Sequence, residues 1–397
     1  MLATLVVLVA AAYVVFALVR GTPGATFVPA ARAHAFPGEP RALAWPAHGE
    51  AAVGVEGVGL LGAHGSGRAT PIASVAKVMT AYLVLRRHPL RRGASGPQIT
   101  VRPVDVAVYR ADRAAGQSVV AVRAGERLTE RQALEGLLLP SGNNLATLLA
   151  RWDAGSQGAF VGKMNALARA LGLAHTHYAD ASGASAGTVS DAEDQVRLAM
   201  LALGVPIFRQ IVATAQVTLP VAGRQYNVDG LLGRDGIIGI KTGSTSQAGG
   251  CFVFAARKLV AGRSVTVVGA VLHQVATRAQ PSILGVVFRA STTLLAGAHR
   301  EVARLTAVRR GATLAHVMTP WGARVAVKAA SSVSFLGWPE LPSHTVFGTR
   351  YFLTVPIKAG QTIGTAFVSA GEQRAQVRLV AARAVAGPSF SWRLTHP

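Results

Sequence analysis

One stretch of this sequence restricts strongly how the chain can fold: residues 71–85, PIASVAKVMTAYLVL. From Val75 to Leu85, apolar residues occur all around the circumference of a 3.6-residue turn, which predicts a helix enclosed by protein. Lys77 lies inside this helix, and a buried ammonium group is tolerated only when it is paired, hydrogen-bonded or shifted toward neutrality. Ser74 precedes it by three residues, so the two side chains share one helix face. The stretch therefore predicts a serine and a lysine in contact within the core.

The composition describes a large folded protein with a strong positive charge. A chain of 397 residues, half of them apolar and 15% charged, is expected to fold as two domains. The net charge of +22 predicts attraction to an anionic wall polymer, anionic lipid or nucleic acid, although arginine enrichment from genome composition explains it equally well. No nucleic acid partner is expected, because no zinc finger or RNA-binding signature occurs. The single cysteine, Cys251, excludes an intramolecular disulfide and a cysteine-based zinc site.

The N-terminus carries a candidate membrane segment. Leu2 to Val19 are 18 uncharged residues, which just reach the length of a bilayer span. We expect an uncleaved anchor rather than a cleavable signal, because no basic residue precedes the apolar run. Arg20, Arg32 and Arg41 follow the run, and the positive-inside rule would leave that side in the cytoplasm. Large domains translocate largely regardless of such charges, so we expect the bulk of the chain outside.

The chain divides by sequence pattern into four parts. Residues 1–20 form the membrane anchor or signal, and residues 21–47, rich in proline and glycine, are predicted to be a linker. Residues 48–300 mix helical and strand patterns. Residues 302–397 consist of short β-like runs separated by turns, which predicts a smaller all-β domain.

A short polar connection is predicted between two helices near residue 140. Thr129 and Gln132 form a capping box that opens a helix, and Pro140 stops it. A second helix starts near Asn144. Residues 141–143, Ser-Gly-Asn, therefore join the two helices, and their side chains are free to face a cleft.

The following sequence predicts further helices and then a change to strands. Residues 190–203 form an amphipathic helix for which Ser190 is the expected cap. Residues 235–256 change to a strand, turn and strand, with glycine and polar residues at the bend. Lys-Thr-Gly at 241–243 lies on the first of these strands. A helix over residues 280–299 follows.

Three short motifs occur along the chain in this order: Ser74-Val75-Ala76-Lys77, Ser141-Gly142-Asn143 and Lys241-Thr242-Gly243. Each one alone is explained by helix capping or by a strand entering a turn. Together, each on its expected element, they match the signature of active-site serine penicillin-binding proteins and class A β-lactamases.

The chain resembles one family in particular, the serine-type D-alanyl-D-alanine carboxypeptidases, which are low-molecular-mass penicillin-binding proteins of the peptidase S11 type. The segments AGERLTERQALEGLLLPSGNNLA, MNALARALGL, VPIFRQIV and GIKTGSTSQAGGC are similar to that family in order and spacing. The likeness runs from about residue 48 to the C-terminus. It implies a penicillin-binding/β-lactamase-like transpeptidase fold of the α/β (α+β) class, an antiparallel sheet with helices, followed by a small all-β domain.

The catalytic residues follow from what an acyl-transfer reaction requires. A serine hydroxyl is a poor nucleophile until a neighbour removes its proton, and a lysine kept neutral by burial and a nearby cation can do so. Ser74 is then the nucleophile and Lys77 its base. Lys241 supplies the nearby positive charge, and Ser141, between the two lysines, can pass a proton to the leaving amine.

Substrate binding is predicted to rest on the second and third motifs. Asn143 carries an amide that can orient both the lysine base and the peptide group of the substrate. The resemblance implies an oxyanion hole formed by the backbone N–H groups of Ser74 and Ser244, and a carboxylate clamp formed by Lys241 and Thr242. The predicted substrate-binding residues are Asn143, Lys241, Thr242, Gly243 and Ser244.

The resemblance implies a membrane-anchored enzyme whose catalytic domain acts outside the cytoplasm. It would remove the terminal D-alanine from peptidoglycan stem peptides that end in D-Ala-D-Ala, through an acyl-serine intermediate. No metal or cofactor is expected. The expected partners are the stem peptide, β-lactam antibiotics as covalent inhibitors, and the membrane.

Three alternatives stay open. A class A-like β-lactamase needs a glutamate between the second and third motifs, where Glu193 is the only one and no E-x-x-L-N run occurs. A non-catalytic wall-binding or scaffold protein could keep the fold without turnover. A zinc peptidase is suggested by His175 and His177, followed by Asp180, but no H-E-x-x-H motif accompanies them.

Overall fold

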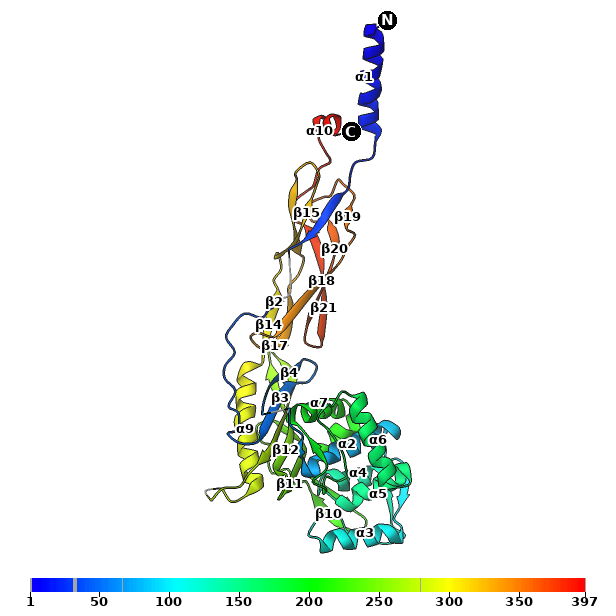
Figure 1. The fold of residues 1–397 in the computed structure, drawn as a ribbon, viewed down its shortest axis with the longest axis vertical. Helices are drawn as coiled ribbons and strands as arrows, with labels where there is room; N and C mark the ends of the chain where they lie inside the picture. The colour runs from blue at the N-terminus through cyan, green and yellow to red at the C-terminus, as the bar shows by residue number, and fades with distance from the viewer. Residues whose placement is uncertain (1, 31–33, 66, 279, 397) are drawn as a thin grey trace. The chain divides into compact units, whose positions relative to one another are not determined.

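The computed structural model describes residues 2–30, 34–65, 67–278 and 280–396 (Figure 1). These residues form two compact units. One is Arg41–Val302, and the other combines both ends of the chain, Met1–Pro40 with Ala303–Pro397.

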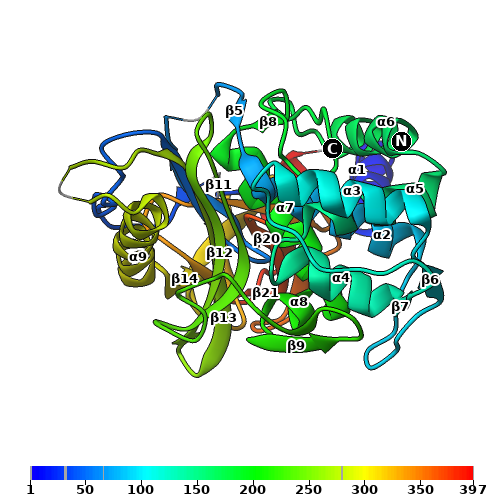
Figure 2. The same ribbon diagram turned by 90° about the horizontal axis from the view of Figure 1, so that it is seen from below.

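The Arg41–Val302 unit is built on a five-stranded antiparallel sheet with the strand order β11-β12-β13-β3-β4. Figure 2 shows helix α9 (Ile283–Glu301) on one side of this sheet and the other helices of the same unit on the opposite side. The central strand β12 is apolar on both faces because both are covered, and it is buried along its first eight residues. The strands are β3 (Glu50–Val55), β4 (Gly59–His64), β11 (Ile237–Thr245), β12 (Gly249–Val260) and β13 (Arg263–Gln274).

Helix α2 (Lys77–Arg87) lies at the centre of the helical layer, as its uniformly apolar sequence predicts. Its residues from Lys77 to Leu85 are all buried. The surrounding helices are α3 (Pro103–Ala114), α4 (Glu130–Leu138), α5 (Asn143–Ala154), α6 (Gln157–Ala170), α7 (Ala192–Leu203) and α8 (Pro206–Val212). Three two-stranded ribbons complete the unit: β5 (Thr70–Pro71) with β8 (Val189–Ser190), β6 (Gln98–Thr100) with β7 (Arg127–Thr129), and β9 (Gln216–Leu219) with β10 (Gly223–Tyr226).

The second unit is all-β apart from one helix at each end of the chain. Its main sheet has the order β19-β1-β15-β16-β21-β20-β18-β2, and β14 pairs with β17. Its strands from the C-terminal part are β14 (Ala303–Val308), β15 (Thr313–Met318), β16 (Arg324–Ala329), β17 (Val333–Gly337), β18 (Pro342–Gly348), β19 (Phe352–Leu353), β20 (Thr362–Ala370) and β21 (Gln373–Ala381).

The structure corrects the predicted linker over residues 21–47. Within it, β1 (Ala25–Pro29) pairs with β15 and β19, and β2 (His34–Ala35) pairs with β18. These two strands are short, and their partners lie about 290 to 330 residues away in sequence. Local sequence patterns carry no information on such distant pairing, so the proline-rich composition alone was misleading.

Helix α1 (Leu2–Val19) is long and apolar enough to cross a membrane, with a mean hydropathy of 2.8. Among its residues Ala17 is buried, and the other apolar side chains are largely exposed in the protein alone. The short helix α10 (Phe390–Thr395) ends the described chain, and Tyr13 of α1 donates a hydrogen bond to the Leu394 carbonyl at 2.6 Å. The length and composition of this helix are compatible with a membrane span.

Candidate active site

Ser74 lies where the chain enters the central helix. Residues Ala73–Ala76 form a short 3₁₀ turn, η1, that continues directly into α2. Ala73 has a φ of 47°, in the left-handed region that non-glycine residues rarely occupy. Ser74 itself is partly exposed. The strained residue therefore turns the chain so that the serine is accessible at the start of an otherwise buried helix.

Lys77 has three hydrogen-bond acceptors, one for each N–H of an ammonium group. Its Nζ lies 2.7 Å from Ser74 Oγ, 2.6 Å from Asn143 Oδ1 and 2.9 Å from the Ser182 carbonyl oxygen. The side chain is fully buried. The predicted contact between Ser74 and Lys77 is thus present, and the lysine also joins it to the second motif.

The surroundings of Lys77 favour its neutral form. Burial lowers its pKa well below the usual value, and the positive charge of Lys241 lowers it further. The negative charges of Asp180 and Asp112 act in the opposite direction. A neutral amine 2.7 Å from Ser74 Oγ can accept the hydroxyl proton, which an ammonium group cannot.

Ser141 and Gly142 connect α4 to α5, and Asn143 is the first residue of α5. Ser141 is buried and has a φ of 67°. Asn143 donates from Nδ2 to Gln117 Oε1 at 2.7 Å while its Oδ1 faces Lys77, so the orientation of the amide is fixed on both sides. In the described part of the chain, no hydrogen bond joins the Ser141 hydroxyl to Lys77. Gln117 is a lone glutamine in a loop, and no motif in the sequence marks it as a site residue.

Strand β11 brings the third motif against the backbone of the nucleophile. A Cβ atom added at Gly243 would lie 2.8 Å from the Ser74 backbone nitrogen and 3.1 Å from Ala73 Cβ. Only glycine permits this approach, because a side chain would push the strand away. Thr242 is buried and Ser244 is exposed on the same strand, which forms an edge of the sheet.

Lys241 is a second buried lysine beside the first. Its Nζ donates to the Thr242 carbonyl at 3.0 Å. Burial lowers its pKa to about 7, and the charge of Asp229 opposes this effect. Burial in turn raises the pKa of Asp229 to about 6. Asp229 Oδ1 accepts from the Leu231 backbone N–H at 3.0 Å, and Oδ2 has no hydrogen-bond partner among the described residues.

The glutamate on which a class A-like mechanism would depend lies on the surface. Glu193 is in the first turn of α7, and its carboxylate pairs with Arg197 at 3.5 Å. This i,i+4 pair is partly exposed and belongs to the helix surface. Nothing in its contacts connects it with Ser74 or Lys77.

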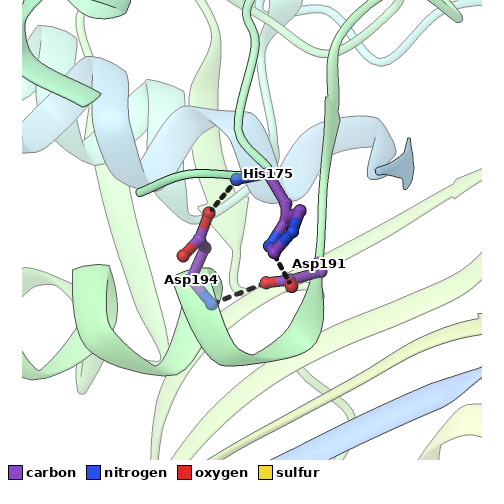
Figure 3. Close-up of side chains that lie close together, drawn as sticks. All are labelled: His175, Asp191 and Asp194. Atoms are coloured by element: carbon purple, nitrogen blue, oxygen red, sulfur yellow. Dashed lines mark hydrogen bonds and ion pairs between the residues drawn. The ribbon is translucent and has the colours of Figure 1, made fainter. Parts of the chain in front are cut away.

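His175 binds two aspartates at the N-terminus of helix α7. Figure 3 shows His175, Asp191 and Asp194, whose candidate ligand atoms lie within 4.8 Å of one another. Asp191 Oδ1 accepts from the Asp194 backbone N–H at 2.8 Å, which makes Asp191 the N-cap of α7, and its Oδ2 lies 2.9 Å from His175 Nδ1. Asp194 Oδ2 accepts from the His175 backbone N–H at 2.9 Å. The cap predicted at Ser190 was therefore wrong by one residue.

Comparison with known proteins agrees with this geometry. Residues 56–272 match the family model for peptidase S11, D-alanyl-D-alanine carboxypeptidase. The D-alanyl-D-alanine carboxypeptidase of Streptomyces sp. (strain K15) is 33% identical over 226 residues, which cover 53% of this chain and 74% of that protein. DacB2, a D-alanyl-D-alanine carboxypeptidase of Mycobacterium tuberculosis, is 38% identical over 197 residues, 48% of this chain and 63% of that protein.

Solved structures show the same fold. The Streptomyces K15 DD-transpeptidase aligns with a TM-score of 0.57 at 27% identity, covering 66% of this chain and all of that chain. Penicillin-binding protein 5 of Haemophilus influenzae aligns with a TM-score of 0.60 at 19% identity, covering 88% of this chain and all of that chain. The second likeness shows the fold alone, and its coverage includes part of the β-rich unit. The protein thus has the predicted penicillin-binding fold, and the chain belongs to the peptidase S11 family of serine-type D-alanyl-D-alanine carboxypeptidases.

Proposed function

We propose that this protein removes the terminal D-alanine from peptidoglycan stem peptides ending in D-Ala-D-Ala, through an acyl-serine intermediate. The observation that carries this proposal is the position of Lys77. It is fully buried, hydrogen-bonded to both Ser74 and Asn143, and its pKa is lowered by burial and by Lys241. This is the arrangement that converts a serine hydroxyl into a nucleophile near neutral pH.

In the acylation step, Ser74 Oγ attacks the carbonyl carbon of the penultimate D-alanine and neutral Lys77 takes the hydroxyl proton. The bond to the terminal D-alanine nitrogen then breaks. That nitrogen receives a proton as it leaves, and Ser141, on the connection between α4 and α5, is the group proposed to relay it. Water subsequently attacks the acyl-serine ester, which returns Ser74 and releases the shortened peptide.

The third motif is proposed to hold the substrate. Lys241, when charged, and Thr242 would bind the terminal carboxylate, which selects peptides with a free C-terminus. The backbone N–H groups of Ser74 and Ser244 would bind the oxyanion that develops during attack. The close approach of Gly243 to the Ser74 nitrogen supports this pairing, because it brings the two backbone segments together.

A β-lactam would acylate the same serine. Its amide is part of a ring, so the nitrogen stays tethered after the bond breaks and does not diffuse away. We therefore propose covalent inhibition by penicillins. We also propose that α1 anchors the enzyme in the membrane with the catalytic unit on the outer side, where stem peptides occur.

The experiment uses the full chain in detergent, since β1 and β2 belong to the β-rich unit and a chain starting at residue 47 would lack them. Released D-alanine is measured from a peptide ending in Lys-D-Ala-D-Ala. Ser74→Ala should abolish release, whereas Ser264→Ala, an exposed serine on β13, should leave it unchanged. Absence of release from a folded wild type, together with absence of penicillin labelling, would refute the proposal and favour a non-catalytic scaffold.

A further inference from the structure

The third acceptor of Lys77 belongs to a loop that is organised around one carboxylate. Asp180 is 8% exposed. Its Oδ1 accepts from Thr188 Oγ1 at 2.5 Å, and its Oδ2 accepts from Ser182 Oγ at 2.6 Å and from the Ala184 backbone N–H at 3.0 Å. The Ser182 backbone N–H also points to Oδ2, at 3.2 Å. Four donors from three residues thus close the loop onto Asp180.

This loop contacts the catalytic helix at two further points. Thr80 on α2 donates to the Ala181 carbonyl at 2.6 Å, which ties the loop to the helix one turn after Lys77. Gly183 has a φ of 80°, and a Cβ atom there would lie 1.7 Å from the Ala73 carbonyl oxygen. Ala73 is the strained residue immediately before Ser74. The conformation of the loop therefore bears on both the base and the backbone of the nucleophile.

Three charged groups on three different segments shift the pKa of Lys77. Lys241 on β11 lowers its pKa, while Asp180 in the loop and Asp112 on α3 raise it. Asp180 differs from Asp112 because it is also connected to Lys77 through a single residue: it binds the Ser182 hydroxyl and N–H, and the Ser182 carbonyl accepts from Lys77 at 2.9 Å.

We propose that Asp180 is a positioning residue for the Lys77 base, which fixes the Ser182 carbonyl against the Lys77 amine and balances part of the positive charge in the site. It acts through Lys77 and touches no reacting atom. The inference rests on the proposed function, in which Lys77 deprotonates Ser74. It assigns a catalytic consequence to a residue outside the three motifs.

The test compares two isosteric substitutions of buried aspartates in the full-length protein. Asp180→Asn removes the charge from the loop, and Asp191→Asn, the matched control, removes one from the cap of α7, which has no contact with Lys77. The rate of acylation by penicillin is measured from pH 4 to 9. We expect Asp180→Asn to lower the plateau rate about tenfold or more. The substitution weakens hydrogen bonds to a charged group, and the loss of one such bond is enough to change a rate about tenfold.

The pH profile separates positioning from mere stabilisation. Without the negative charge, Lys77 loses its proton at a lower pH, so the acid limb of the Asp180→Asn profile should move to lower pH. The Asp191→Asn limb should stay in place, even if its melting temperature falls. An Asp180→Asn protein with an unmoved acid limb, whether slow or fast, would overturn the inference while leaving the proposed function intact.

Ser182→Ala provides an independent test if Asp180→Asn does not fold. It removes the 2.6 Å bond to Asp180 but keeps the charge and the carbonyl. A several-fold slower acylation with an unmoved acid limb is expected, and a wild-type rate would overturn the inference. Failure of the wild type itself to react with penicillin would refute the proposed function and this inference with it.

Discussion

The alkaline side of the activity profile tests the electrostatics around Lys241. Its pKa is lowered to about 7 by burial, and the proposed clamp on the substrate carboxylate needs its charged form. One pH unit above this value, about a tenth of the free enzyme keeps the charge, so kcat/KM should fall about tenfold for each further unit. In the complex, the bound carboxylate stabilises the ammonium group. We therefore expect kcat to fall at a higher pH than kcat/KM.

Asp229→Asn is the perturbation that isolates this effect. The charge of Asp229 raises the pKa of Lys241, so removing it should move the alkaline limb of kcat/KM to lower pH. The substitution is nearly isosteric, and the Asn side-chain oxygen can still accept from the Leu231 backbone N–H. Each unit by which the limb moves lowers kcat/KM at pH 8 about tenfold. The acid limb, which reports Lys77, should change much less.

The assay is D-alanine release from a peptide ending in Lys-D-Ala-D-Ala between pH 5 and 10, with kcat and KM separated at each pH. Asp235→Asn is the matched control, because Asp235 is exposed on the same connection before β11. Its φ of 51° is a conformation that asparagine adopts as readily as aspartate. Coincident alkaline limbs in wild type and Asp229→Asn, or an upward movement in the variant, would refute the assignment of this limb to Lys241.

Three further predictions concern the base, the strand and a buried acid. Lys77→Met should lower the penicillin acylation rate by about 10²–10⁴, the usual contribution of general base catalysis, and an undiminished rate would exclude Lys77 as the base. Gly243→Ala should slow acylation in a folded protein, because its Cβ would lie 2.8 Å from the Ser74 nitrogen; normal kinetics would contradict the tight approach. Glu130 has two carboxylate oxygens without partners among the described residues, and burial raises its pKa to about 7 from 4.5. Its protonated form therefore stabilises the fold at acidic pH, and this contribution is lost as the pH rises from about 4.5 through 7. Glu130→Gln should raise the melting temperature at pH 8 and change it little at pH 4.5, and equal shifts at both pH values would disprove this.

The sequence predicted the elements on which the site is built because their signals are local. The uniformly apolar surroundings of Lys77 correspond to a helix that is buried along its first nine residues. The capping box of Thr129 and Gln132 is present, with both reciprocal hydrogen bonds. Pro140 follows α4 as expected, so Ser141 and Gly142 lie between two helices, and Asn143 is the first residue of the second helix rather than the last of the connection. The roles assigned to the individual site residues stay predictions until the substitutions are measured.

Other features had no local signal. The Ser182 carbonyl that binds Lys77 is a backbone group, and any residue type supplies one. Gln117 is recognisable only through its contact with Asn143, 26 residues away in sequence. The strands β1 and β2 looked like a linker because their pairing partners lie at the other end of the chain. In each case the feature depends on a contact between residues far apart in the sequence, and short-range periodicity does not reveal such contacts.

Two buried lysines in one site can perform different tasks only if their charge states differ. Burial lowers the pKa of both, and the positive charge of Lys241 lowers that of Lys77 further, so near neutral pH the pair is expected to carry one proton rather than two. Lys77 loses its proton first, because burial and the charge of Lys241 both lower its pKa, whereas the charge of Asp229 supports the protonated form of Lys241. The result is a neutral amine facing Ser74 and an ammonium group available for the substrate carboxylate, an arrangement of two like residues set apart by their environments. Because the carboxylates support different members of the pair, Asp229→Asn should narrow the active pH range from the alkaline side, whereas Asp180→Asn should extend it on the acid side at a lower maximal rate.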